Sequence, residues 1–142
     1  GVNGQGPPVR LGDLKGKTVF LNYWATWCEP CIREIPSMLA LARELPRSQF
    51  RMVAVSYDDS WEPVVSFFNQ YTGGLPPELL LARDAKGQDE GSLRLRMGTE
   101  KLPETYIVRD GMILHKFISN HDWADPRKKA YFRMMTQGGA GR

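Results

Sequence analysis

Two cysteines separated by two residues are the part of this sequence best suited to chemistry. Cys28 and Cys31 are the only cysteines among the 142 residues, and Glu29 and Pro30 lie between them. A thiolate can attack a disulfide, and a second thiol at this spacing can then displace the captured partner. The pair is a poor structural staple, because stabilisation by a disulfide grows with the loop it closes. The spacing therefore favours a redox couple.

The flanking residues predict where the two thiols lie. The apolar and aromatic run Thr18–Trp24 predicts a strand buried on both faces, and apolar residues recur at helical spacing from Pro30 to about Leu45. Cys28 then lies at a helix start, where unpaired backbone N–H groups and the helix dipole stabilise a thiolate. Cys31, nearly one turn further along, is the expected resolving thiol.

Three other uses of such a cysteine pair are less favoured. Two ordinary buried thiols would need no special position, whereas a helix start is where a reactive thiol is expected. Zinc would need further ligands, and the only histidines, His115 and His121, lie far downstream without zinc-finger spacing. A cysteine hydrolase needs a nearby base, which nothing local provides. We therefore expect a dithiol site with no metal and no cofactor.

Length and composition predict a single domain. The 142 residues, 42% hydrophobic and 11% aromatic, can bury a core and argue against intrinsic disorder. No apolar run approaches the roughly 20 residues that cross a bilayer. The net charge is +3 with dispersed basic residues, so no nucleic acid partner is expected. We expect a flexible segment over residues 1–10, one domain over 11–136 and a flexible tail over 137–142.

The rest of the chain predicts alternating strands and helices. The expected elements after the first strand and helix are a strand over Met52–Val55, a helix over 64–71, a strand over Leu79–Ala82, a helix over Leu93–Met97, strands over 104–108 and 112–118, and a final helix from Pro126. Asp110-Gly111 is a strong hairpin turn signal. This order predicts an α/β fold, a mixed sheet with helices on both faces.

The segment around the cysteines resembles the thioredoxin-like superfamily. Residues 20–36, Phe-Leu-Asn-Tyr-Trp-Ala-Thr-Trp-Cys-Glu-Pro-Cys-Ile-Arg-Glu-Ile-Pro, match its active-site motif, with Trp27 before the pair and Pro36 after it. Residues 102–111, Leu-Pro-Glu-Thr-Tyr-Ile-Val-Arg-Asp-Gly, match the segment with the family's cis-proline, here Pro103. Within the superfamily the chain is similar to exported reductases of the ResA/TlpA/CcmG type.

The resemblance implies a thioredoxin fold and a substrate-binding surface beside the disulfide. Trp27, Glu29 and Pro30 are expected to contact the substrate. Leu102 and Pro103 are expected to lie against the disulfide, where the Leu102 backbone can pair with an extended substrate strand.

One departure from thioredoxin concerns the proton acceptor for the resolving thiol. Thioredoxins have a buried aspartate six residues before the first cysteine, where this chain has Asn22, as the exported branch commonly does. Asp58 and Asp59 follow the second expected strand, and either is a candidate acid or base, with helix N-capping as the alternative. Glu29 is a further candidate, and its charge opposes thiolate formation, which favours a reductant over an oxidant.

These implications together describe a thiol–disulfide oxidoreductase that reduces protein disulfides. The expected substrates are apocytochrome c or copper-assembly proteins, and the expected electron donor is a membrane-bound dithiol protein. The resemblance implies a monomer in the periplasm or another extracytoplasmic compartment. A chain beginning at Gly1 is expected to have lost any export signal or membrane tether.

Three alternatives remain open at this point. A general thioredoxin reduced by a soluble reductase is disfavoured by Asn22. A peroxidase of the related family would carry a Pro-x-x-x-Thr-x-x-Cys pattern, which is absent before Cys28. A copper-binding or chaperone module on the same fold would space its cysteines by three residues and add a histidine.

Overall fold

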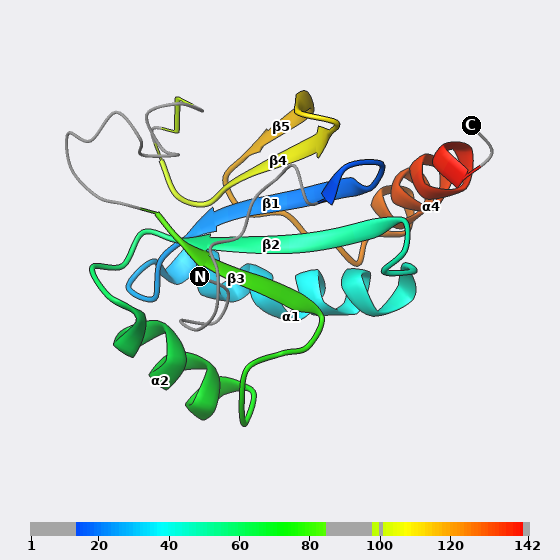
Figure 1. Ribbon diagram of the computed structural model, residues 1–142. Coiled ribbons are helices and arrows are strands. Elements are labelled where there is room, and N and C mark those ends of the chain that lie inside the picture. The colour runs from blue at the N-terminus through cyan, green and yellow to red at the C-terminus, as the bar shows by residue number, and fades with distance from the viewer. Residues whose placement is uncertain (1–13, 85–97, 100, 141–142) are drawn as a thin grey trace.

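The computed structural model describes residues 14–84, 98–99 and 101–140 of the chain (Figure 1). The elements are, in order, β1 (Thr18–Trp24), α1 (Glu29–Glu44), β2 (Phe50–Ser56), α2 (Trp61–Tyr71), β3 (Leu79–Arg83), β4 (Glu104–Arg109), β5 (Met112–Ile118) and α4 (Pro126–Ala140). No helix in the described parts of the chain is long and apolar enough to cross a membrane.

The strands form one mixed sheet, as the sequence predicts. Their order is β3-β2-β1-β4-β5, with β1, β2 and β3 parallel and with β4 and β5 antiparallel. The register pairs Trp24 with Ser56 and Ser56 with Arg83, so the carboxyl ends of the parallel strands meet at one edge. The loop that leads from β1 to the start of α1 leaves the sheet at this edge (Figure 1).

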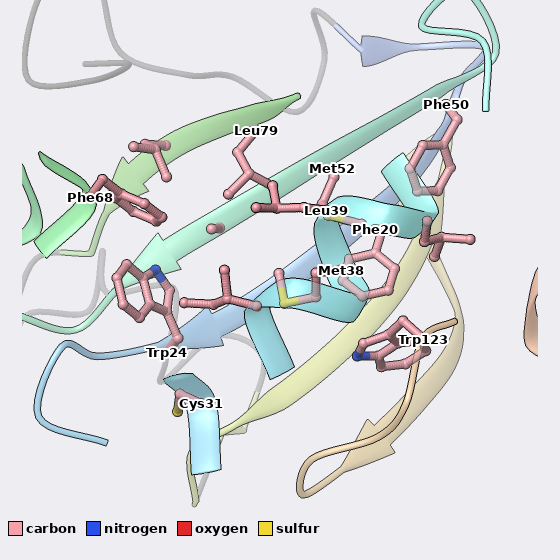
Figure 2. Close-up of a cluster of buried hydrophobic side chains, with 14 of the residues drawn as sticks. Phe20, Trp24, Cys31, Met38, Leu39, Phe50, Met52, Phe68, Leu79 and Trp123 are labelled. Carbon is pink, nitrogen blue, oxygen red and sulfur yellow. The ribbon is translucent and has the colours of Figure 1, made fainter. Parts of the chain in front are cut away.

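Each face of the sheet buries its own apolar cluster, because side chains alternate between the two faces of a strand. From β1, Phe20 and Trp24 join the cluster that also receives buried side chains of α1, α2 and α4 (Figure 2). Val19, Leu21 and Tyr23 join the second cluster on the opposite face. Asn22 has the parity of Phe20 and Trp24, so its side chain points to the same face as α1.

The predicted elements agree with the structure to within a few residues at their ends. The hairpin turn is at Asp110 and Gly111, where φ is positive, +50° and +80°, as this turn signal requires. The helix expected over Leu93–Met97 and the segment over residues 1–10 lie outside the described residues. One boundary was wrong: α4 continues to Ala140, so residues 137–140, expected in the tail, belong to the helix.

Candidate active site

Cys28 and Cys31 form a disulfide at the start of α1, with their Cα atoms 5.3 Å apart. Cys28 is the N-cap residue, with extended backbone angles, and its sulfur accepts a hydrogen bond from the Cys31 backbone N–H at 3.4 Å. Cys28 is 7% exposed and Cys31 is 1% exposed. The two sulfurs are therefore unequal, and Cys28 is the one that an incoming disulfide can reach.

A cavity of about 410 Å³ opens beside Cys28. The residues that line it are Trp27, Cys28, Glu29, Pro30, Tyr57, Thr99 and Leu102. The structure thus brings together four of the five expected substrate-contacting residues, and Trp27 among them is 64% exposed. The fifth, Pro103, is buried and is not among the lining residues, and the peptide bond between Leu102 and Pro103 is cis.

Two cavity residues, Tyr57 and Thr99, were not predicted from the sequence. Tyr57 follows β2 directly, and its backbone N–H donates to the Trp24 carbonyl at 2.8 Å. Its position directly after a parallel strand could have predicted that it lies near the cysteines, because the carboxyl ends of the parallel strands meet at that edge of the sheet. Thr99 lies 71 positions from Cys28 in the chain and no local pattern marks it.

Asp58 anchors the loop that precedes Cys28. Its carboxylate accepts hydrogen bonds from the Thr26 N–H at 3.1 Å, the Thr26 hydroxyl at 2.6 Å and the Ser56 hydroxyl at 2.6 Å. Asp59 is exposed, and the N-cap position of α2 is occupied by Ser60 rather than by either aspartate. The contacts of Asp58 thus fix the loop, and an acid or base role for Asp58 or Asp59 stays a prediction.

A buried glutamate that the sequence analysis missed lies on the same helix as the cysteines. Glu34 is 1% exposed and follows Cys31 by three residues, a spacing that places two side chains on one helix face. Its carboxylate accepts hydrogen bonds from the Asn22 side chain at 3.0 Å, the His121 backbone N–H at 2.8 Å and the Trp123 indole N–H at 2.9 Å.

Burial and hydrogen bonding act on the Glu34 carboxyl in opposite directions. Desolvation by burial raises the pKa of Glu34 above the ordinary 4.5, although the three hydrogen bonds act in the opposite direction. Asn22, at the position where thioredoxins have an aspartate, donates to this carboxylate, so the helix supplies the acid that β1 lacks. The available signal was a charged residue on the apolar face predicted for this helix.

Glu29 sits between the cysteines at the surface. Its carboxylate is 3.8 Å from the Arg33 guanidinium, and both side chains are largely exposed, at 81% and 63%. An exposed pair at this distance contributes little to stability. Arg33 nevertheless places a positive charge beside Glu29, which offsets part of the repulsion that Glu29 exerts on a thiolate.

A buried polar network holds the loop on the far side of the cavity. Glu104 accepts hydrogen bonds from the Lys101 backbone N–H at 3.0 Å and the Tyr106 hydroxyl at 2.7 Å, and it pairs with Lys116 at 3.2 Å. The Tyr106 hydroxyl is also 2.7 Å from that of Thr99. Burial, together with Glu104, raises the pKa of Tyr106 to about 12. This network fixes the two ends of the segment containing Leu102.

The two histidines lie among aromatic side chains, His115 on β5 and His121 in the loop between β5 and α4. The His115 ring contacts Tyr131 with centroids 5.3 Å apart, and the His121 ring contacts Phe117 at 5.4 Å. Across the described ranges, no group of three or more His, Cys, Asp or Glu side chains is arranged to hold a metal ion.

Comparison with known proteins places the chain in a defined group. Residues 1–116 match the AhpC/TSA family. The chain is 35% identical over 115 residues to the thiol-disulfide oxidoreductase ResA of Bacillus thuringiensis, an alignment that covers 80% of this chain and 62% of that protein. It is 30% identical over 139 residues to the thiol:disulfide interchange protein DsbE of Pseudomonas aeruginosa, covering 94% of this chain and 71% of that protein.

A solved structure has the same fold. The crystal structure of a putative thiol:disulfide interchange protein DsbE from Chlorobium tepidum superposes with a TM-score of 0.71 and 26% identity, over 92% of this chain and 85% of that one. The thioredoxin fold implied by the sequence is therefore confirmed.

Proposed function

Because the chain belongs to the AhpC/TSA family, and within it to the group that contains ResA and DsbE, we propose that it reduces protein disulfides by dithiol exchange. The observation that carries this proposal is the Cys28–Cys31 disulfide at the start of α1, beside a cavity of about 410 Å³. The chain spans 62% of the length of its ResA relative, so its activity, substrates and partners are proposals.

The reaction begins with both cysteines reduced. The Cys28 thiolate attacks one sulfur of the substrate disulfide, forms a Cys28–substrate bond and releases the other substrate sulfur as a thiolate. The Cys31 thiolate then attacks the Cys28 sulfur, restores the Cys28–Cys31 bond and releases the second substrate thiolate. The substrate gains two electrons and two protons, and the protein loses them.

Glu34 takes the proton that Cys31 must lose in the second step. Cys31 is 1% exposed, so water is a poor direct acceptor, and Glu34 lies one helical turn further along the same buried face. A carboxyl whose pKa is raised by burial is closer in proton affinity to a thiol than an exposed carboxyl is. Asn22 orients the carboxylate from the side of β1.

The cavity suits an extended polypeptide as substrate. Trp27 and Leu102 line the cavity beside Cys28, and the Leu102 backbone is the proposed pairing partner of a substrate strand. Apocytochrome c or copper-assembly proteins are the proposed substrates, a membrane-bound dithiol protein is the proposed donor, and the proposed location is extracytoplasmic. These assignments rest on the similarity to ResA and DsbE.

The peroxidase alternative is not proposed for this chain. Leu21 and Ala25 stand where the peroxidatic pattern has proline and threonine before the cysteine.

The test uses a pair of matched single-cysteine variants and insulin as the disulfide substrate. Cys31→Ser should accumulate a mixed disulfide, visible on a non-reducing gel, because Cys28 can attack but nothing resolves the product. Cys28→Ser should form none and should lose insulin reduction. Capture through Cys31 in the Cys28→Ser variant, or full activity of that variant, contradicts the assignment.

The trapping variant also identifies the substrate class. Cys31→Ser incubated with an extracytoplasmic extract should capture cytochrome c precursors or copper-assembly proteins. Capture of a broad mixture, together with turnover by a soluble thioredoxin reductase, would instead indicate a general thioredoxin.

A further inference from the structure

The loop between β5 and α4 is fastened to the cysteine-bearing helix at Glu34 and Ser37. The Trp123 indole N–H and the His121 backbone N–H both donate to the same oxygen of Glu34, at 2.9 and 2.8 Å. The Trp123 backbone N–H donates to the Ser37 hydroxyl at 3.0 Å, and that hydroxyl donates to the Glu34 carbonyl at 3.0 Å. Trp123 therefore holds one turn of α1 by both its backbone and its side chain.

The Trp123 ring has little freedom to move. It is 0% exposed and packs edge-on against Phe20, with centroids 4.7 Å apart (Figure 2). Phe117 and Phe132 contact it at 5.1 and 6.2 Å. The indole N–H is thus aimed at the Glu34 carboxylate by the core, and it needs no rearrangement when Glu34 changes charge.

The groups that face the Glu34 carboxylate are neutral donors within the described part of the chain. Asn22 donates from β1 to the second oxygen, and it also donates to Thr105 of β4 at 2.9 Å. The titratable groups nearby are Cys31 on the same helix and the His121 ring, whose centroid is 5.4 Å from that of Trp123. An indole N–H can donate but cannot accept, so its contact favours the ionised carboxylate.

We propose that Trp123 is a positioning residue for the second step of exchange: its indole N–H holds Glu34 in the orientation and charge state in which Glu34 accepts the proton of Cys31. This inference rests on the proposed function, because Glu34 acts only if Cys31 must lose a proton. Trp123 touches neither the substrate nor the cysteines in this role, and it acts through the carboxylate alone.

The test is the pH dependence of resolution in Trp123→Phe. Reduced protein reacts with a chromogenic aromatic disulfide, and a first coloured thiolate leaves as Cys28 attacks. A second leaves as Cys31 resolves the mixed disulfide. The rate of the second phase is measured as a function of pH. Loss of a donor to a buried carboxylate should move the acidic limb of this pH–rate profile to higher pH by about one unit. The limb reports the Glu34–Cys31 pair rather than either group alone.

Trp24→Phe is the matched control. Trp24 is 2% exposed in the same apolar cluster, and its indole N–H has no hydrogen-bond partner among the described residues. The substitution Trp24→Phe removes the same atoms from the core as Trp123→Phe does, but it takes no hydrogen-bond donor away from Glu34. The second-phase limb of Trp24→Phe should therefore match that of the unmodified protein.

The Glu34→Gln background separates this inference from the proposed function. Trp123→Phe should add no further shift there, because the group it acts on is gone. An equal shift with and without Glu34, or no shift at all, overturns the role of Trp123 while the first phase still reports attack by Cys28. Loss of the first phase in the unmodified protein would instead overturn the proposed function.

A measurement on the unmodified protein covers the case in which Trp123→Phe does not fold. The Trp123 indole N–H resonance, followed by NMR in the oxidised protein, should move with pH as Glu34 titrates, and that of Trp24 should not. A Trp123 resonance that stays constant until the fold is lost overturns the inference.

Discussion

At the scale of single residues, the thiol that meets the substrate and the groups proposed to exchange a proton lie in different surroundings. Cys28 borders the cavity, whereas Cys31 and Glu34 share a buried helix face and are each 1% exposed. The buried carboxyl is Glu34 on the helix, whereas the strand position carries Asn22, and the two side chains are hydrogen-bonded. The helix therefore supplies a carboxyl three residues after Cys31, although the strand position is neutral.

The exposed Trp27 ring is the proposed substrate contact beside Cys28. Trp27→Ala should lower kcat/KM for insulin about tenfold, because truncating an aromatic anchor at a binding surface typically costs about 1–2 kcal/mol. Reduction of a small aromatic disulfide should change little, since such a substrate does not cover the Trp27 surface. Steady-state kinetics with both substrates measure the difference.

Met134→Ala is the control for that change. Met134 lies on α4, is 70% exposed and does not line the cavity, so its loss should leave both reactions unaltered. If Trp27→Ala reduces insulin as fast as Met134→Ala does, Trp27 is not part of the substrate surface.

At the scale of elements, the site is assembled where the parallel strands end. The loop after β1 carries Cys28, and the residues after β2 hold that loop through Asp58. Three hydrogen bonds to the Asp58 side chain come from Thr26 and Ser56. The carboxylate therefore fixes the approach of the chain to the helix start.

Asp58→Asn should destabilise the oxidised protein by about 1–3 kcal/mol, because the amide would face an N–H or O–H donor with a donor of its own. Urea unfolding followed by circular dichroism measures the loss. Asp59→Asn, at the exposed neighbouring position, should cost no more than about 1 kcal/mol. Equal stability of the two variants would contradict the anchoring role of Asp58.

Local patterns were sufficient to predict most elements and the dithiol. The apolar run of β1 and the helical spacing in α1 each lie within a single stretch of chain, and so does the turn at Asp110-Gly111. Glu34 was missed because its partners His121 and Trp123 are 87 and 89 residues away in the sequence. No local periodicity reports a contact of that kind, which only the closed fold creates.

At the scale of the whole molecule, the sheet brings an early and a late part of the described chain together at one site. β1 and α1 supply the cysteines, and the hairpin of β4 and β5 leads into the loop that carries Trp123 (Figure 1). The apolar cluster on the helix side includes both Cys31 and Trp123. The core that stabilises the fold therefore also sets the surroundings of the resolving thiol.

The most direct test of dithiol exchange compares, in one turnover, the substrate disulfides reduced with the Cys28–Cys31 disulfides formed. Reduced protein is mixed with insulin in limiting amount, and the thiols of both proteins are then alkylated and counted by mass spectrometry. Dithiol exchange predicts one new Cys28–Cys31 disulfide for each insulin disulfide lost, and no loss with Cys28→Ser. Loss of insulin disulfides while Cys28 and Cys31 both remain thiols would contradict it.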